Sequence, residues 1–187
     1  IIAVWQVQPG LAGYAPTETY VRNILVGMTA TQRFGRTWGA SVEVWGAQSS
    51  ETPLLRELRD LGAEPEVISK FNWIAGATAE ANLLSAIDRV TGQIPNRNDL
   101  YLRGGGGIVN TDLEICREEG GVQCAAPFLV QGANFGYVTA GIGHRFYVAR
   151  WGTFRTEVRS RTVFELIDGT YTPRPDIQIN LGPTFVF

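Results

Sequence analysis

Along most of the chain, apolar and polar residues alternate at every second position, which is the pattern of β-strands with one apolar and one polar face. The C-terminal segment DIQINLGPTFVF is the clearest example, because Ile177, Ile179 and Leu181 alternate there with Gln178 and Asn180. Alternation of this kind predicts eight strands, at residues 1–12, 20–33, 37–47, 71–83, 99–109, 132–146, 152–166 and 175–187.

The seventh predicted strand decides which way these faces point. One of its faces carries Phe154, Phe164 and Leu166, and the other carries five charged side chains. Charged side chains cost a few kcal/mol in lipid and are also costly in a dry protein core, so they suit a polar lumen or the solvated face of a soluble sandwich. The lumen interpretation predicts a network of paired charges made of Glu43, Glu80, Arg103, Arg155, Glu157, Arg159 and Arg161.

The connection after the third strand carries a helix signal. Thr52 and Pro53 suit an N-cap and a first helical position, and Gly62 suits the end of the helix. The leucines of this segment form one apolar stripe. The stripe could contact a protein partner or simply cap the barrel mouth, and its members are Leu54, Leu55, Leu58 and Leu61.

Connection lengths predict the topology. If the C-terminus is periplasmic, the long connections 48–70 and 110–131 lie outside the cell and the tight turns near 34–36 and 148–151 lie in the periplasm, with 84–98 as the exception. We therefore expect an all-β, eight-stranded antiparallel up-and-down transmembrane barrel in the bacterial outer membrane, with a short helix in an extracellular loop. The final aromatics, Phe185 and Phe187, are expected to act as a signal for barrel assembly.

Composition agrees with a single domain spanning residues 1–187. The chain has a mass of 20.5 kDa and a mean hydropathy of -0.02, and no stretch approaches the 18 apolar residues of a transmembrane helix. The net charge of -2 gives no case for nucleic acid. Because the sequence begins at Ile1 without a methionine, we expect a processed or partial chain whose signal peptide has been removed.

Candidate chemistry is sparse. Cys116 and Cys124 are expected to form a disulfide in an oxidising compartment, the alternative being two free thiols. Without a nearby histidine they do not make a zinc site, and the acidic residues around Cys116 more simply form a solvated loop than a cation site. The single histidine, His144, is expected near the periplasmic end on the lipid or interface face. No catalytic, cofactor or metal site is predicted.

Three segments carry a family resemblance: YVRNILVGMTATQRFGRTWGASVEVW, YLRGGGGIV and GIGHRFYVARWGTFRTEVR. They resemble a family of small outer-membrane β-barrel domain proteins common in myxobacteria and related delta-proteobacteria, over most of residues 5–187. The resemblance implies the fold and the location, and it implies no functional residues. Some members of that family are parts of larger envelope assemblies.

The predicted function is a structural or interaction subunit of a cell-envelope or surface assembly, with a filled polar lumen and no large pore. Its expected partners are outer-membrane lipid and other envelope proteins, without nucleic acid or cofactor. A small-solute channel and a surface receptor or adhesin are the alternatives, and a lipid-modifying enzyme is a weaker one. A soluble lipocalin-like barrel is the rival fold.

Overall fold

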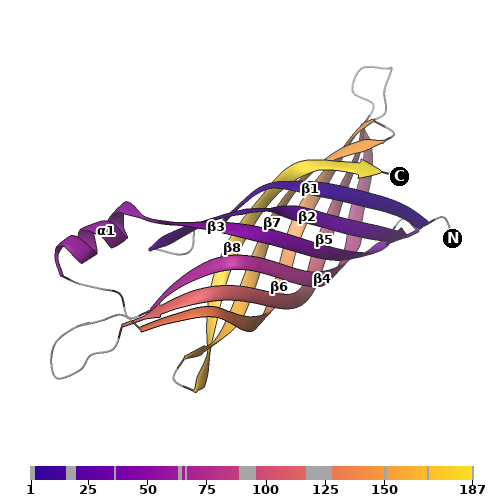
Figure 1. Cartoon of the computed structure of the whole chain (residues 1–187). Coiled ribbons are helices and arrows are strands. Elements are labelled where there is room, and N and C mark those ends of the chain that lie inside the picture. Colours follow the sequence, from indigo (N-terminus) through magenta and orange to yellow (C-terminus); the bar gives the residue numbers. More distant parts are fainter. Residues whose placement is uncertain are drawn as a thin grey trace.

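The computed structural model describes residues 3–15, 20–35, 37–62, 65, 67–88, 96–116, 128–149, 151–167 and 169–186. Each strand pairs with its neighbours in sequence, all antiparallel, and β8 returns to β1 to close a barrel (Figure 1). The elements are β1 (Ala3–Ala15), β2 (Val21–Phe34), β3 (Trp38–Glu51), α1 (Pro53–Asp60), β4 (Val67–Asp88), β5 (Asn96–Ile115), β6 (Phe128–Ala149), β7 (Gly152–Ile167) and β8 (Thr170–Val186).

The predicted fold class is confirmed: eight antiparallel strands form a closed ring, with one short helix between β3 and β4. The predicted helix ends are also confirmed, because Thr52 is the N-cap, Pro53 opens the helix and Gly62 follows it with φ of 74°. Both termini lie at one end of the barrel and α1 lies at the other (Figure 1). We call these the terminal end and the helix end. None of the described helices is long and apolar enough to cross a membrane.

Several strands are longer than predicted. The predicted turn at 84–98 is wrong, because β4 continues to Asp88 and β5 begins at Asn96. The pairing of β4 with β5 shifts register between Asn82 and Leu84, so one extra residue reverses the alternation there without ending the strand. The connection 110–131 was also predicted too long, because β5 reaches Ile115, and the strand predicted at 175–187 starts earlier, at Thr170.

The outer wall of the barrel is apolar. Outward side chains such as Val26, Val42 and Ile108 are each more than half exposed. Aromatic residues gather on this wall near the terminal end, where Trp151 stacks on Phe185, and they are Phe34, Trp38, Phe146, Trp151, Phe154 and Phe185. An apolar band flanked by aromatic residues around a polar interior is the arrangement of a barrel surrounded by lipid.

At the helix end the wall separates into three extensions. Pairing of β3 with β4 stops at Gly46 and Trp73, pairing of β6 with β7 stops at Gly136 and Phe164, and pairing of β1 with β8 stops at Tyr14 and Ile179. Beyond those points β2 continues with β3, β4 continues with β5 and β6, and β7 continues with β8. The ribbon shows these extensions spreading apart (Figure 1).

The helix fills the gap between the first two extensions. Leu55 is fully buried and packs with Val21 of β2 and Ile68 of β4. The N–H of Thr52 donates to the carbonyl oxygen of Tyr20 at 2.9 Å, and the Thr52 hydroxyl accepts from the N–H of Leu55 at 3.4 Å. The apolar stripe of α1 therefore has one residue that belongs to the fold.

Leu55→Ala should release α1 from the barrel. Removing a fully buried leucine side chain costs about 2–5 kcal/mol, and here the loss falls on the contact of α1 with β2 and β4. Hydrogen exchange of the α1 amides should accelerate accordingly, while strand amides near the terminal end keep their protection. Leu61→Ala is the control, because Leu61 is 80% exposed. Equal exchange rates in the two variants would contradict this docking.

Candidate functional site

The half of the lumen nearer the terminal end holds a network of buried charges. Glu80 on β4 is shared by three arginines: it accepts from Arg33 at 2.9 Å, from Arg145 at 2.5 Å and from Arg155 at 2.8 Å. These arginines come from β2, β6 and β7, so one carboxylate links strands on different sides of the barrel. In a low-dielectric interior such charges are tolerable because each is paired and hydrogen-bonded.

Two further carboxylates continue the network toward the barrel middle. Glu43 accepts from Arg159 at 2.7 and 2.9 Å and from Arg103 at 3.3 Å. Glu157 pairs with the same two arginines and accepts a hydrogen bond from the Tyr101 hydroxyl at 2.7 Å. Since all five side chains are at most 4% exposed, they fill the barrel cross-section rather than line an open channel.

Tyr101 occupies a slot that a glycine makes possible. The guanidinium groups of Arg145 and Arg155 lie 5.0 and 4.6 Å from the centre of its ring. On the neighbouring strand, a Cβ added to Gly143 would lie 2.2 Å from the ring carbon Cζ of Tyr101. The ring therefore packs directly against the backbone of β6, which fixes the phenol among the arginines.

The half of the lumen nearer the helix end holds a buried apolar cluster, which the sequence did not predict. Its buried cluster joins β2 to β7, and includes Leu25, Trp45, Phe71, Ile74, Val109, Leu113, Phe135, Tyr137 and Val163. In the strand predicted at 71–83, a period of two places Phe71 on the same outer face as Trp73, and this placement is wrong. A register shift between these two residues turns Phe71 inward, where it is 3% exposed.

Every residue of the predicted lumen network lies inside the barrel. Six of the seven join the network described above, and Arg161 instead pairs with Asp176 of β8 near the apolar cluster, with its guanidinium 4.9 Å from the centre of the Phe71 ring. Sequence reasoning missed Arg33, Tyr101 and Arg145. Their positions in the alternation would have pointed to them, because each occupies an inward position on its strand.

The other predicted site residues differ in how deeply they are buried, and two of them lie outside the described residues. Leu55 is buried within the fold, whereas Leu54 and Leu61 are exposed and Leu58 is partly buried. Phe185 is 37% exposed on the outer wall, and Phe187 lies outside the described residues. Cys124 also lies outside them, so its pairing with Cys116 stays a prediction.

His144 packs edge-on against Phe146, with ring centres 4.0 Å apart. It lies opposite Leu100 of β5 and Thr156 of β7. Across the described ranges, no three side chains of the His, Cys, Asp and Glu types come together as a metal site.

A second group of charges lies beyond the apolar band, where α1 meets the barrel. Arg59 of α1 donates to Glu51 of β3 at 2.8 Å and to Glu114 of β5 at 2.9 Å, and Lys70 of β4 contacts the same two carboxylates. Burial raises the pKa of Glu51, but hydrogen bonds and charge from Arg59 and Lys70 outweigh it and hold that pKa below its usual value. Burial likewise lowers the pKa of Lys70, and Glu114 and Glu51 raise it further than burial lowers it.

These shifts predict a pH window for the docking of α1. Because the pKa of Glu51 is lowered, Glu51 stabilises the docking of α1 at neutral pH, and this stabilisation is lost as the pH falls through the lowered pKa. Because the pKa of Lys70 is raised, the stabilisation that Lys70 gives to the docking of α1 is lost only as the pH rises through the raised pKa. Because these side chains are about 30% exposed, the pairs contribute roughly 1 kcal/mol or less. Backbone amide chemical shifts of α1 should therefore stay constant near neutral pH and move in acid. Identical acid-induced shifts in an Arg59→Gln variant would contradict the role of these pairs.

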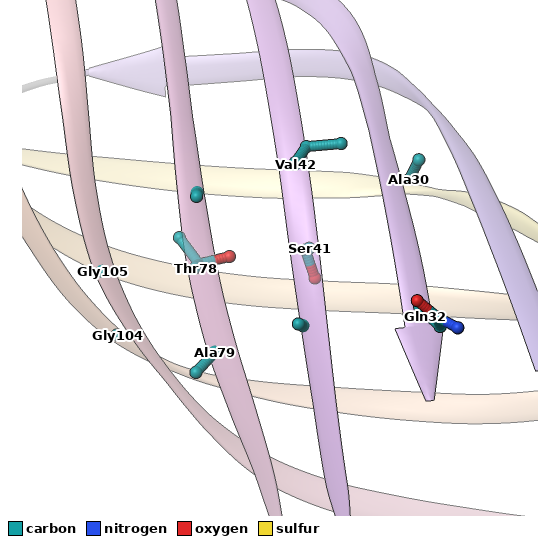
Figure 2. Close-up of a pocket in the computed structure, with 10 residues that line it drawn as sticks. Ala30, Gln32, Ser41, Val42, Thr78, Ala79, Gly104 and Gly105 are labelled. Atoms are coloured by element: carbon teal, nitrogen blue, oxygen red, sulfur yellow. The ribbon is translucent and has the colours of Figure 1, made fainter. Parts of the chain in front are cut away.

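The outer wall carries a shallow hollow of about 500 Å³ across β2, β3, β4 and β5 (Figure 2). It exists because small residues follow one another on adjacent strands, among them Ala30, Ala40, Ala77, Ala79 and Gly104. Val42 and Gln32 stand beside it.

Comparison with known proteins supports the fold. The chain matches the crystal structure of Ail, the attachment invasion locus protein of Yersinia pestis, with a TM-score of 0.51, 11% identity and coverage of 100% of both chains. It matches the crystal structure of Neisserial surface protein A with a TM-score of 0.53 and 12% identity, over 99% of this chain and 96% of that one. No family model and no curated protein matches the sequence. By its topology, its apolar outer wall and these two likenesses, the chain has the fold of a small eight-stranded outer-membrane β-barrel.

Proposed function

We propose that this chain is a bacterial outer-membrane barrel that serves as a structural or interaction subunit of an envelope or surface assembly, with a sealed lumen. The observation that carries the proposal is the filling of the lumen. Charges shared among Glu43, Glu80 and Glu157 occupy one half, and the cluster around Trp45 and Phe71 occupies the other. A barrel filled in this way offers its neighbours an outer wall and the extensions at its helix end.

Its position in an assembly can be tested by gentle detergent extraction from native membranes, followed by sizing and mass spectrometry of co-eluting proteins. A defined complex much larger than 20.5 kDa is the expected result. An Arg59→Ala, Leu55→Ala double variant tests whether α1 contacts the partners, because it should loosen α1 while leaving the apolar outer wall of the barrel unchanged. A barrel that elutes alone in every detergent would overturn the proposal.

A small-solute channel is the main alternative. The filled lumen argues against it, and single-channel recording in a planar bilayer separates the two functions. We expect no porin-sized conductance from the intact barrel. Steady conductance that increases when the paired Glu43 is replaced by alanine would favour the channel.

A surface receptor or adhesin is a second candidate, favoured by the three extensions and by the likeness to a protein described as an attachment invasion locus protein. Binding of the purified barrel to cells or matrix, lost when the extensions are shortened, would support it. An enzyme is not proposed, because His144 packs beside Phe146 and Leu100 on the wall assigned to lipid.

Phe185 and Phe187 are proposed to signal barrel assembly. The stacking of Phe185 on Trp151 gives this end of β8 a defined aromatic contact. Deleting Phe187 should slow insertion in cells more than it lowers stability in detergent, and insertion at the normal rate would count against the signal.

A further inference from the structure

A row of amide side chains crosses the outer face just above the apolar band. Trp73 of β4 lies opposite Asn110 of β5, and Asn110 lies opposite Asn134 of β6. Asn72 is the extra residue at the register shift in β4, which brings it beside the same row. Three neighbouring strands thus present an indole and three carboxamides side by side. We call this set, Asn72, Trp73, Asn110 and Asn134, the amide row.

The amides of this row are held in fixed orientations. Asn72 Nδ2 donates to Asn110 Oδ1 at 3.1 Å. Asn110 Nδ2 in turn donates to Asn134 Oδ1 at 2.8 Å and to the carbonyl oxygen of Gly132 at 2.9 Å. Exposed amides ordinarily exchange such bonds with water, so a continuous chain of three marks a preorganised surface. Within the part of the chain that the structure describes, Asn72 Oδ1 and Asn134 Nδ2 remain unbonded, so an acceptor and a donor are available to a ligand.

The position of the amide row along the barrel axis shows which layer of the membrane it faces. On β5, Ile108 below the row is 51% exposed and belongs to the apolar band, whereas Asp112 above it is polar. Trp73 is 40% exposed at this border, where aromatic side chains mark the edge of the hydrocarbon. With the C-terminus in the periplasm, as the connection lengths predict, the row lies at the headgroup level of the outer leaflet.

Charge favours a neutral ligand group over a phosphate. The nearby cations, Lys70 and Arg59, are already paired with Glu51 and Glu114. Asp112 next to the row accepts the N–H of Gly132 and would repel an anion. Fixed carboxamides offer both donors and acceptors, which match the hydroxyl groups of a sugar, and the indole offers an apolar face on which a sugar ring can lie.

We propose that the amide row binds the saccharide of an outer-leaflet glycolipid. This inference rests on the proposed location in the outer membrane and goes beyond it by assigning a ligand to one face. The sugar would lie across β4, β5 and β6 with its hydroxyls on Asn72 and Asn134 and a ring against Trp73, while the acyl chains of the same molecule lie along the band below.

The test is a titration of the refolded barrel in detergent micelles with rough-type lipopolysaccharide, which carries inner-core sugars. Side-chain amide NMR signals of Asn72, Asn110 and Asn134, and the indole signal of Trp73, report binding at the site itself. We expect these signals to shift together, and Asn110→Ala to weaken half-saturation at least tenfold. Asn98→Ala is the matched control, because Asn98 occupies an outward position on the same strand at the terminal end. Asn134→Asp, which keeps the size of the side chain, covers the case in which Asn110→Ala does not refold.

Three results would overturn the site: equal binding by wild type and both row variants, equal shifts with phosphatidylethanolamine, which has phosphate and acyl chains but no sugar, or equal affinity for the free core oligosaccharide. The first result would mean that the amide row is not the binding site. The second would assign recognition to phosphate or acyl chains, and the third would mean that the site binds a soluble oligosaccharide rather than a glycolipid. The proposed subunit role fails on a different result, elution without partners, which leaves the titration unaffected.

Discussion

Glu80→Leu should lower the free energy of unfolding of the barrel by about 3–5 kcal/mol, one of the two largest effects that we expect from a single substitution. Glu80 is fully buried and holds Arg33, Arg145 and Arg155 within 2.9 Å. Removing one partner of a buried ion pair leaves an uncompensated charge in a low-dielectric site, and here three guanidinium groups lose their common carboxylate.

The measurement is urea unfolding in detergent micelles, monitored by tryptophan fluorescence or by the mobility of the folded form on a gel. Glu57→Leu removes the same charge from an exposed position on α1 and should change stability by roughly 0.5 kcal/mol or less. Glu80→Gln should fall between the two, since it retains hydrogen-bonding capacity without the charge. If all three variants unfold at one denaturant concentration, the shared carboxylate does not hold the lumen together.

Gly143→Ala should destabilise the barrel by about 2–3 kcal/mol although it adds a single methyl group. The added Cβ would lie 2.2 Å from both the Cζ and the hydroxyl oxygen of Tyr101. Tyr101 has no room to retreat, because Arg145 and Arg155 lie against its ring and its hydroxyl donates to Glu157. Overpacking of a filled interior typically costs this much, and it should also disturb the arginines.

Gly136→Ala on the same strand is the control, because a Cβ there meets nothing within 4 Å. It should be neutral or slightly stabilising, since alanine restricts the unfolded chain more than glycine does. Comparing the two variants separates the steric role of one glycine from the general cost of changing β6. Indistinguishable unfolding midpoints would mean that Tyr101 has space that the structure does not give it.

Much of the fold was predictable because the period of two survives along whole strands. In β7, every second residue from Arg155 to Glu165 points inward without interruption, so the charged face was identified correctly. The alternation failed where one residue is inserted, as at Asn72 and Leu83, since everything beyond the insertion changes face. The wrong facing of Phe71 and the missed length of β4 both arise from these insertions.

The site was less predictable, for a different reason. Pattern alone places Arg33 and Arg145 on inward faces, but it does not reveal that they meet at Glu80 from strands on either side of it. Such contacts depend on the stagger of the closed barrel, which no local period encodes. The apolar cluster in the lumen was missed similarly: its members, such as Leu25 and Val109, come from six different strands, and they form a cluster only once the ring has closed.

The separated extensions leave backbone edges that could pair with foreign strands, and three of these edges, on β4, β8 and β6, carry features that hinder such pairing. Leu55 of α1 packs against β4 at the edge of the second extension. In β8, the N–H of Val186 donates toward β7 and the register is unbroken, so Pro173 and Pro175 fall on the opposite edge, where they provide no N–H.

On β6, the register shift at Gly132, which has a positive φ, bends the strand and with it the edge that faces β7. Strand addition is thus disfavoured at the edges of β4, β6 and β8. A neighbour that approaches the barrel at these edges must recognise side chains on its faces rather than extend its sheet.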